Sequence, residues 1–352
     1  MDPILLLSAL LLMAFGLLGV GVAEPTLLPH HLLRISVALG AMILGLLLPP
    51  ARLLRHARFL LAATFVLLAL VLMVGSGPGG VRRWFYLGPL AFQPSELAKV
   101  VLVYYLASFV GRKGNDYPIV GAAALVGLTA GLVLVEPDFA TALFLVTLAG
   151  LLFILAGVPW RRLIMVSLAG TMVLAPFSGI YFARFRYVSE RFTGFVDYLQ
   201  GEASPSQTAY QVLQAQKALI LAGPLGQGPS GNLPHLPEAH NEMVFASVVF
   251  ATGWLGGFMV LLLYFLIFAR GLALALRLPG PLGLVALGLT LYLTLQAALN
   301  IGVTVGFLPV TGVPLPLVSY GGSSLLVSGF AVGALMRLAR EASRKGVEPW
   351  SS

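Results

Sequence analysis

The 352-residue chain is 59% apolar and only 10% charged, with a mean hydropathy of +0.95. Soluble globular proteins have about 45–50% apolar and about 25% charged residues, so these values exclude a soluble enzyme, a disordered chain and a repeat solenoid. Cysteine is absent, which excludes disulfides, iron–sulfur clusters, thiolate zinc sites and cysteine nucleophiles. The net charge of +8 would suggest nucleic acid for a soluble protein, but the charge arrangement indicates a membrane, and we expect no nucleic-acid partner.

Apolar segments long enough to cross a bilayer recur along the chain. A spanning helix needs about 17–25 mainly apolar residues, because irregular backbone in hydrocarbon leaves polar groups unpaired. The sequence predicts about ten spans, at residues 4–22, 32–48, 59–74, 97–110, 119–135, 141–155, 163–177, 243–268, 282–299 and 325–338. We therefore expect an all-α integral membrane protein in which residues 1–352 form a single polytopic membrane domain.

The charges are distributed unequally between the two sides of this arrangement. With the N-terminus inside, most basic residues fall in the inner loops and in a basic tail at 339–352, whereas the outer loops are rich in carboxylates. The positive-inside rule then places both termini in the cytoplasm and a large extracytoplasmic loop at 178–242, between spans seven and eight. No soluble domain is attached, so a catalytic site must be built from outer loops and span ends.

Two outer segments place carboxylates near the start of a span. Glu96 and Lys99 are three residues apart, so they share one helix face and can pair at the edge of the hydrocarbon. They are either a structural ion pair beside an interfacial anchor or part of a substrate site, because ionisable residues at span ends are costly. Asp138 is placed to cap the next helix at Thr141, to bind a cation or to line an outer cavity.

The long outer segment carries cationic side chains, then a glycine-rich run at 223–231, then a cluster of carboxylates. Arg186, Arg191 and Lys217 are candidates for binding a pyrophosphate. Backbone amides in glycine-rich turns can cradle phosphate, although such glycines usually mark only a loop. Glu238 and Glu242 stand where the chain re-enters the membrane, so one of them can act as general base on a sugar hydroxyl. His240 is a second candidate base or a hydrogen-bonding spacer.

The segment before the last span is irregular yet almost uncharged. Three prolines among glycines at 308–324 forbid a regular helix, so we expect a re-entrant Pro/Gly loop. Such backbone survives at membrane depth only where it is buried in protein or lines a cavity. Ser319 and Tyr320, near the end of this segment, are candidates for contact with a substrate.

In this order on a ten-span chain, these segments resemble the SEDS family of shape, elongation, division and sporulation proteins, whose members include RodA and FtsW. The most specific part runs from residue 309 to residue 324, where the Pro-Leu-Pro at 314–316 leans toward the RodA branch. Residues 92–96 with Lys99, Pro137-Asp138 with Thr141-Ala142, and residues 236–240 also match. The resemblance implies a peptidoglycan glycosyltransferase that polymerises lipid II at the outer face of the bacterial cytoplasmic (inner) membrane during cell elongation or division.

The same resemblance implies partners and a mechanism. The partner is a class B penicillin-binding protein that supplies the transpeptidase, within the elongation or division machinery. An outer carboxylate deprotonates the 4-hydroxyl of the acceptor GlcNAc, which attacks the anomeric carbon of the lipid-pyrophosphate donor. Basic residues, or a divalent cation such as Mg²⁺ or Mn²⁺, stabilise the departing pyrophosphate. No residue is assigned as a metal ligand, and no other cofactor is expected.

Glu242 stands where the family usually has an Asp that is held to be catalytic, and Phe250-Ala251 replaces a further acidic pair. The glutamate keeps the charge but moves the carboxylate by one methylene, and a misplacement of about 1 Å can cost on the order of a hundredfold in rate. We expect Glu242 to act as the base. The alternatives are a lipid II flippase, which would place ionisable residues near the bilayer midplane, and a non-catalytic divergent scaffold for the penicillin-binding protein.

Overall fold

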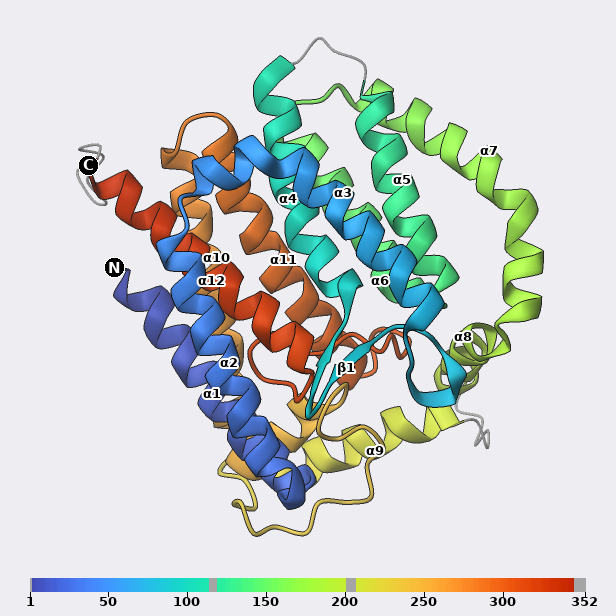
Figure 1. Ribbon diagram of the computed structural model, residues 1–352. Coiled ribbons are helices and arrows are strands. Elements are labelled where there is room, and N and C mark those ends of the chain that lie inside the picture. The colour runs from blue at the N-terminus through green and yellow to red at the C-terminus, as the bar shows by residue number, and fades with distance from the viewer. Residues whose placement is uncertain (1, 114–118, 201–206, 345–352) are drawn as a thin grey trace.

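The computed structural model describes residues 2–113, 119–200 and 207–344 and is almost entirely helical (Figure 1). The helices are α1 (Pro3–Ala23), α2 (Leu28–Leu47), α3 (Pro50–Val74), α4 (Pro94–Lys113), α5 (Val120–Val135), α6 (Phe139–Leu155), α7 (Trp160–Arg184), α8 (Arg186–Leu199), α9 (Gln207–Ala222), α10 (Val244–Arg277), α11 (Pro281–Thr304) and α12 (Gly322–Arg344). Two short strands, β1 (Phe85–Leu87) and β2 (Leu90–Phe92), pair antiparallel, and short 3-10 turns occupy Pro25–Leu27 and Pro78–Gly80.

Within the described ranges, a helix occupies each segment for which a span is predicted. By length and composition, six helices can cross a membrane, namely α1, α2, α3, α10, α11 and α12, while α5 and α6 are shorter apolar helices. The multi-pass helical fold is therefore confirmed, and the count of ten spans stays a prediction. Proline at the first position of α4 and α11 suits these helix starts, because the missing N–H has no partner there in any helix.

The helices form one bundle in which segments distant in sequence lie side by side. Helix α12 packs on α2, α1 packs on α10, and α11 lies between α10 and α4. The approach of α12 to α2 is close, because a Cβ atom added at Gly333 would lie 1.9 Å from the carbonyl oxygen of Met42. Figure 1 shows the start of α1 and the end of α12 at one end of the bundle, and α8, α9, the hairpin and the Pro/Gly loop at the other end, which we call the loop end.

The long outer segment is more ordered than a loop prediction implies. It contains the last turns of α7 and the helices α8 and α9, which the sequence analysis did not predict. The glycine-rich run packs against the kink of α10 at Gly253, where the amides of Gln227 and Gly228 donate to the carbonyls of Phe250 (2.8 Å) and Ala251 (3.0 Å). These two amides are therefore occupied within the protein, which favours the loop interpretation of the run over a phosphate cradle.

The Pro/Gly segment between α11 and α12 is irregular and largely buried, as predicted. Its backbone is held by side chains of the helices around it, since the Tyr264 hydroxyl donates to the carbonyl of Pro316 and Gln296 Nε2 donates to the carbonyl of Pro314 (3.0 Å). Irregular backbone inside a helical bundle needs such partners, because no water is available to satisfy its polar groups. This loop forms one wall of the candidate site.

Candidate active site

A cavity of about 620 Å³ opens at the loop end of the bundle. Its walls come from α2, the hairpin and the segment before it, the start of α4, the turn before α6, α8, the turn before α10, and the Pro/Gly loop. Of the residues proposed from sequence, it is lined by Glu96, Asp138, Arg191, Glu238, His240, Glu242 and Tyr320. Seven of the proposed residues, scattered over more than two hundred positions of sequence, therefore share one hollow.

Glu242 lies in the turn that leads into α10, and two contacts define its position. Its Oε1 is 3.7 Å from Nη2 of Arg191 on α8, and the two side chains are only partly exposed. Its backbone carbonyl accepts a hydrogen bond of 2.8 Å from Nδ2 of Asn300 on α11, and the same amide group donates to the carbonyl of Val313 (2.8 Å). Asn300 thus ties the turn that carries Glu242 to the Pro/Gly loop.

The surroundings of Glu242 change its acidity. Burial raises the pKa of this carboxyl above its ordinary value, and the nearby Glu238 acts in the same direction, while the positive charge of Arg191 partly offsets both. A carboxylate with a raised pKa holds a transferred proton more firmly near neutral pH, which is the property of an effective general base. Glu242 therefore has both a place at the cavity and an acidity suited to taking a proton from a hydroxyl.

Glu96 and Lys99 form the ion pair that their spacing predicts, with Nζ 2.5 Å from Oε1. Lys99 is fully buried behind the cavity wall, where Nζ also donates to Oε1 of Gln296 on α11 (2.9 Å). The side-chain amide of Gln296 in turn donates a hydrogen bond to the carbonyl of Pro314. Polar contacts therefore link α4, α11 and the Pro/Gly loop. Glu96 faces the cavity, whereas Lys99 supports it from behind and does not line it.

Asp138 performs two of the roles that its sequence position allows. One carboxylate oxygen accepts from the Thr141 amide (3.1 Å) and caps α6, as predicted. The other accepts from Nε2 of Gln93 (3.3 Å), and the residue lines the cavity. Close by, Arg83 donates through Nε to the carbonyl of Glu136 (2.6 Å) and through Nη2 to the carbonyl of Pro137, so it fixes this turn against the hairpin.

The sequence analysis missed two arginines of this cavity, Arg34 and Arg83. The guanidinium of Arg34 lies 3.6 Å from the ring centroid of Tyr320 and donates to the Tyr320 carbonyl (2.7 Å). The ring of Tyr320 also contacts the ring of His240 edge to face, with 5.5 Å between the two ring centroids. One signal was present in the sequence, because Arg34 and Arg83 are two of the few basic residues in the predicted outer loops.

Two further residues proposed from sequence do not line the cavity, and the side chain of a third is outside the described part of the structure. Ser319 is buried and does not line the cavity, and its hydroxyl donates to the carbonyl of Asn241 (2.7 Å) and accepts from the amide of Leu315 (2.7 Å). Lys217 is exposed on α9 and does not line the cavity. The backbone of Arg186 begins α8, and its side chain lies outside the described part of the structure.

Within the described ranges, no group of three or more His, Asp or Glu side chains is arranged to hold a metal ion. The positive charge that the described residues bring to the cavity comes from Arg34, Arg83 and Arg191.

The fold is that of a multi-pass membrane protein, with a cavity lined by charged residues at one end of the bundle. A family model for FtsW, RodA and SpoVE, described as a cell cycle protein family, matches residues 5–344. The chain therefore belongs to the SEDS family, as its motifs predict.

Curated relatives and solved structures agree with this assignment. A probable peptidoglycan glycosyltransferase FtsW of Halorhodospira halophila is 37% identical, covering 89% of this chain and 81% of the relative. Peptidoglycan glycosyltransferase MrdB of Escherichia coli K12 is 32% identical, covering 96% and 93%. Since FtsW proteins match at least as well, the leaning toward the RodA branch stays a prediction.

The fold matches experimental structures over nearly its full length. A chain from a peptidoglycan synthase complex, described as coordinating polymerization and crosslinking, superimposes with a TM-score of 0.77 at 32% identity and covers 96% of this chain and 97% of that one. The rod shape determining protein RodA of Thermus thermophilus gives a TM-score of 0.70 at 30% identity, with 96% of each chain covered.

Proposed function

We propose that this protein is a peptidoglycan glycosyltransferase that polymerises lipid II into glycan strands at the outer face of the cytoplasmic membrane. The names of its relatives support the activity, and the cavity supports the chemistry. The observation that carries the proposal is the meeting of Glu242, Arg191, Asp138 and Glu238 in one hollow at the loop end of the bundle. Such a hollow offers a base for a sugar hydroxyl and positive charge for a pyrophosphate.

In the proposed reaction, Glu242 is the general base. Its carboxylate removes the proton from the 4-hydroxyl of the acceptor GlcNAc, and the oxygen attacks the anomeric carbon of the donor. The bond from that carbon to the pyrophosphate oxygen breaks, so undecaprenyl pyrophosphate leaves and the proton stays on Glu242. The raised pKa of Glu242 favours this transfer, because a general base works best when its pKa lies near the pH at which the enzyme acts.

Positive side chains take the role of stabilising the leaving group. Arg191 lies beside the base, and Arg34 on α2 and Arg83 in the segment before β1 line the same cavity. Arginine suits this task because its planar guanidinium can bind two phosphate oxygens at once. We therefore assign the pyrophosphate site to Arg34, Arg83 and Arg191 in place of the set proposed from sequence.

The proposal also includes the orientation of the protein in the membrane and its partner protein. The start of α1 and the end of α12 lie at the end of the bundle opposite the cavity (Figure 1), and the positive-inside rule places the basic loops of that end in the cytoplasm. The cavity then faces outward, where lipid II is consumed. The likeness to a chain of a peptidoglycan synthase complex supports a class B penicillin-binding protein as partner, in elongation or division.

The test is lipid II polymerisation by the purified protein with its cognate class B penicillin-binding protein, comparing the wild type with Glu242→Gln and Glu242→Asp. We expect glycan strands from the wild type and from the Asp variant, and none from the Gln variant, which keeps the side-chain volume but cannot accept the proton. Strands from the Asp variant alone would instead indicate a scaffold that has lost its catalyst. Strands at the wild-type rate from the Gln variant would remove Glu242 from the base role.

A further inference from the structure

The hairpin of β1 and β2 has two faces, and only one of them borders the cavity of the candidate active site. Tyr86 pairs with Ala91 across the two strands, and successive side chains along a strand point to opposite faces. The side chains of one face line the cavity, namely Trp84, Tyr86, Ala91 and Gln93. Those of the other face do not line it, namely Phe85, Leu87, Leu90 and Phe92. The alternation therefore turns two aromatic rings toward the cavity, and the proposed mechanism gives neither ring a role.

The hairpin is braced against neighbouring segments on both strands. The hydroxyl of Ser323 on α12 accepts from the amide of Gln93 (2.8 Å) and donates to the carbonyl of Ala91 (2.7 Å). On the other strand, the backbone of Trp84 exchanges two hydrogen bonds with the backbone of Ser76, of 3.1 and 3.2 Å. The hairpin is therefore in place before a ligand arrives, which lowers the entropy cost of binding.

Of the three tyrosine and tryptophan rings that line the cavity, Tyr86 has the most open surroundings. A Cβ atom added at Gly77 would lie 2.5 Å from Cε3 and Cζ3 of Trp84, so the indole packs against that glycine. The ring of Tyr320 is covered by the guanidinium of Arg34, which lies 3.6 Å from the ring centroid. Tyr86 is 55% exposed, and within the described part of the chain no aromatic ring or cation is stacked on it. The ring of Tyr86 is therefore available to a ligand in the cavity.

Hydrogen-bonding side chains line the cavity together with this ring. Gln93, on the same face of the hairpin as Tyr86, donates through Nε2 to an oxygen of Asp138 (3.3 Å), and both residues line the cavity. A pyranose sugar has apolar faces of C–H groups and a rim of hydroxyls. An aromatic ring packs on such a face, while amides and carboxylates bind the hydroxyls. Tyr86, Gln93 and Asp138 therefore combine the two kinds of contact that suit a sugar ring.

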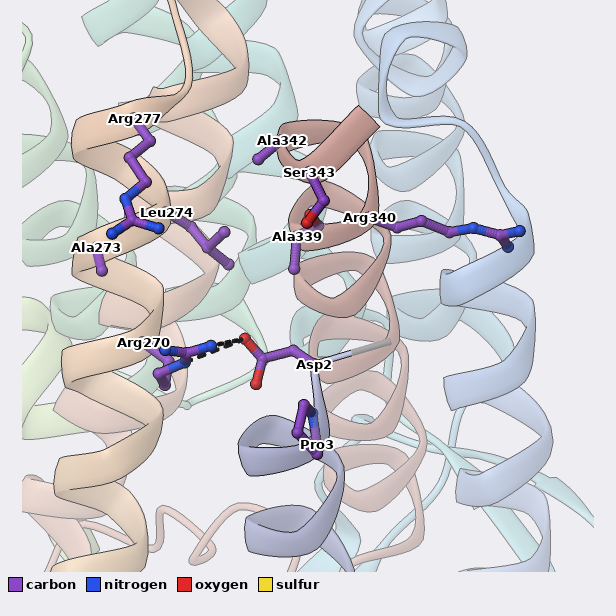
Figure 2. Close-up of a pocket in the computed structure, with 10 residues that line it drawn as sticks. All are labelled: Asp2, Pro3, Arg270, Ala273, Leu274, Arg277, Ala339, Arg340, Ala342 and Ser343. Atoms are coloured by element: carbon purple, nitrogen blue, oxygen red, sulfur yellow. Dashed lines mark hydrogen bonds and ion pairs between the residues drawn. The ribbon is translucent and has the colours of Figure 1, made fainter. Parts of the chain in front are cut away.

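A second, smaller cavity of about 180 Å³ lies at the opposite end of the bundle, where α1 begins and α10 and α12 end (Figure 2). The described residues that line it include arginines and small side chains but no aromatic ring. Its carboxylate, that of Asp2, is paired with Arg270 at 2.7 Å, as Figure 2 shows. Of these two cavities, only the one at the loop end therefore combines aromatic rings with several amides and carboxylates.

We propose that Tyr86 is a stacking platform for a pyranose ring of the substrate, with Gln93 and Asp138 as partners for its hydroxyls. This inference rests on the proposed function, because the ring is then one of the two sugars of lipid II, GlcNAc or MurNAc. The platform adds a sugar subsite on the hairpin to the base and the arginines, which act on the reacting hydroxyl and the pyrophosphate. Because such stacking holds the substrate before and during the reaction, its loss raises KM more than it lowers kcat.

The experiment measures equilibrium binding to the full-length protein in complex with its cognate penicillin-binding protein. The probes are lipid II, the same lipid pyrophosphate carrying MurNAc-pentapeptide without GlcNAc, and undecaprenyl pyrophosphate. The variants are Tyr86→Ala and Tyr86→Phe, with Leu87→Ala as the matched control, because Leu87 is exposed on the next residue of the strand and on the face away from the cavity. The Glu242→Gln substitution is present throughout, so that bound lipid II is not consumed. Both hairpin side chains are exposed, so all variants should keep the melting temperature of the parent protein.

The affinity for lipid II should fall about tenfold in Tyr86→Ala and change by less than about twofold in Tyr86→Phe and Leu87→Ala, as expected for the loss of one aromatic contact. The affinity for undecaprenyl pyrophosphate, which has no sugar, should be the same in all variants. A loss shared by both sugar-bearing probes would place MurNAc on the ring of Tyr86. A loss confined to lipid II would place GlcNAc there.

Equal lipid II affinity in Tyr86→Ala and Leu87→Ala would overturn the proposal. An equal loss for undecaprenyl pyrophosphate would also overturn it, because Tyr86 would then contact the lipid or the pyrophosphate. Equal losses in Tyr86→Phe and Tyr86→Ala would assign the binding to the hydroxyl and not to the ring. Binding requires no turnover, so lipid II affinity that depends on Tyr86, in a complex whose wild type makes no strands, would refute the proposed activity and leave the sugar subsite standing.

Discussion

Replacing Gly312 by alanine tests how finely the Arg191–Glu242 pair is positioned. A Cβ atom at this position would lie 3.1 Å from Nη1 of Arg191 and 3.2 Å from Oε1 of Glu242, so these groups must move by a few tenths of an ångström. If a misplacement of about 1 Å costs about a hundredfold in rate, a shift of about 0.3–0.5 Å costs roughly four- to tenfold. Because Gly312 also has a φ of +82°, the alanine adds about 1 kcal/mol of backbone strain.

The control for the Gly312 variant is Gly223→Ala. Gly223 has a φ of +62°, but a Cβ atom there would meet nothing within 4 Å. Both variants should therefore lose similar thermal stability, whereas only Gly312→Ala should lose polymerisation rate, measured as glycan product per minute with the penicillin-binding protein present. If both variants lose rate equally, or if Gly312→Ala keeps the wild-type rate, the close positioning of the base by this loop is refuted.

Three further predictions concern buried polar groups. Lys99→Met should lower stability by about 3–5 kcal/mol because it leaves the Glu96 charge buried and unpaired, and Glu96→Gln added to it should restore most of the melting temperature but no polymerisation. Asn300→Ala should lower the melting temperature and kcat while changing KM little, because two buried carbonyls, one of them that of Glu242, lose their donor. Burial raises the pKa of Glu136 to about 9, so the folded state holds a proton that the unfolded state releases, and stability should fall as pH rises from about 5 to 9. Glu136→Gln should flatten this decline, and parallel melting curves for the two proteins across that range would contradict it.

Local sequence patterns were sufficient to predict the contacts that residues make within a single helix or turn. The spacing of Glu96 and Lys99 predicted their pairing, and the place of Asp138 before an apolar run predicted its cap on α6. The burial of the Pro/Gly loop also followed from its composition, because irregular backbone in a membrane protein must find partners in protein. The first two predictions hold because they concern neighbours on one helix or one turn.

Contacts between distant segments could not be read from periodicity. Arg34 meets Tyr320 across 286 positions of sequence, and nothing in either segment specifies that α2 packs on α12. For the same reason Lys217 was a reasonable candidate for the site, although α9 turns it toward the exterior. Patterns of hydrophobicity show which face of a helix is buried, but they do not show which helix covers that face.

The candidate active site depends on side-chain amides that the reaction itself does not use. Glu242 and the Pro/Gly loop belong to irregular segments of backbone. A helical membrane protein tolerates such segments only where their carbonyls and amides find hydrogen-bond partners inside the protein. Asn300 and Gln296 supply these partners from successive turns of α11, and Gln296 is itself held by the buried ammonium of Lys99. The turn that carries Glu242 is thus placed by α11 through its backbone, and the Glu242 carboxylate pairs with Arg191 at the cavity. For the base role proposed for Glu242, this arrangement accommodates a side chain one methylene longer than the aspartate usual in the family, because Asn300 holds the turn by its backbone.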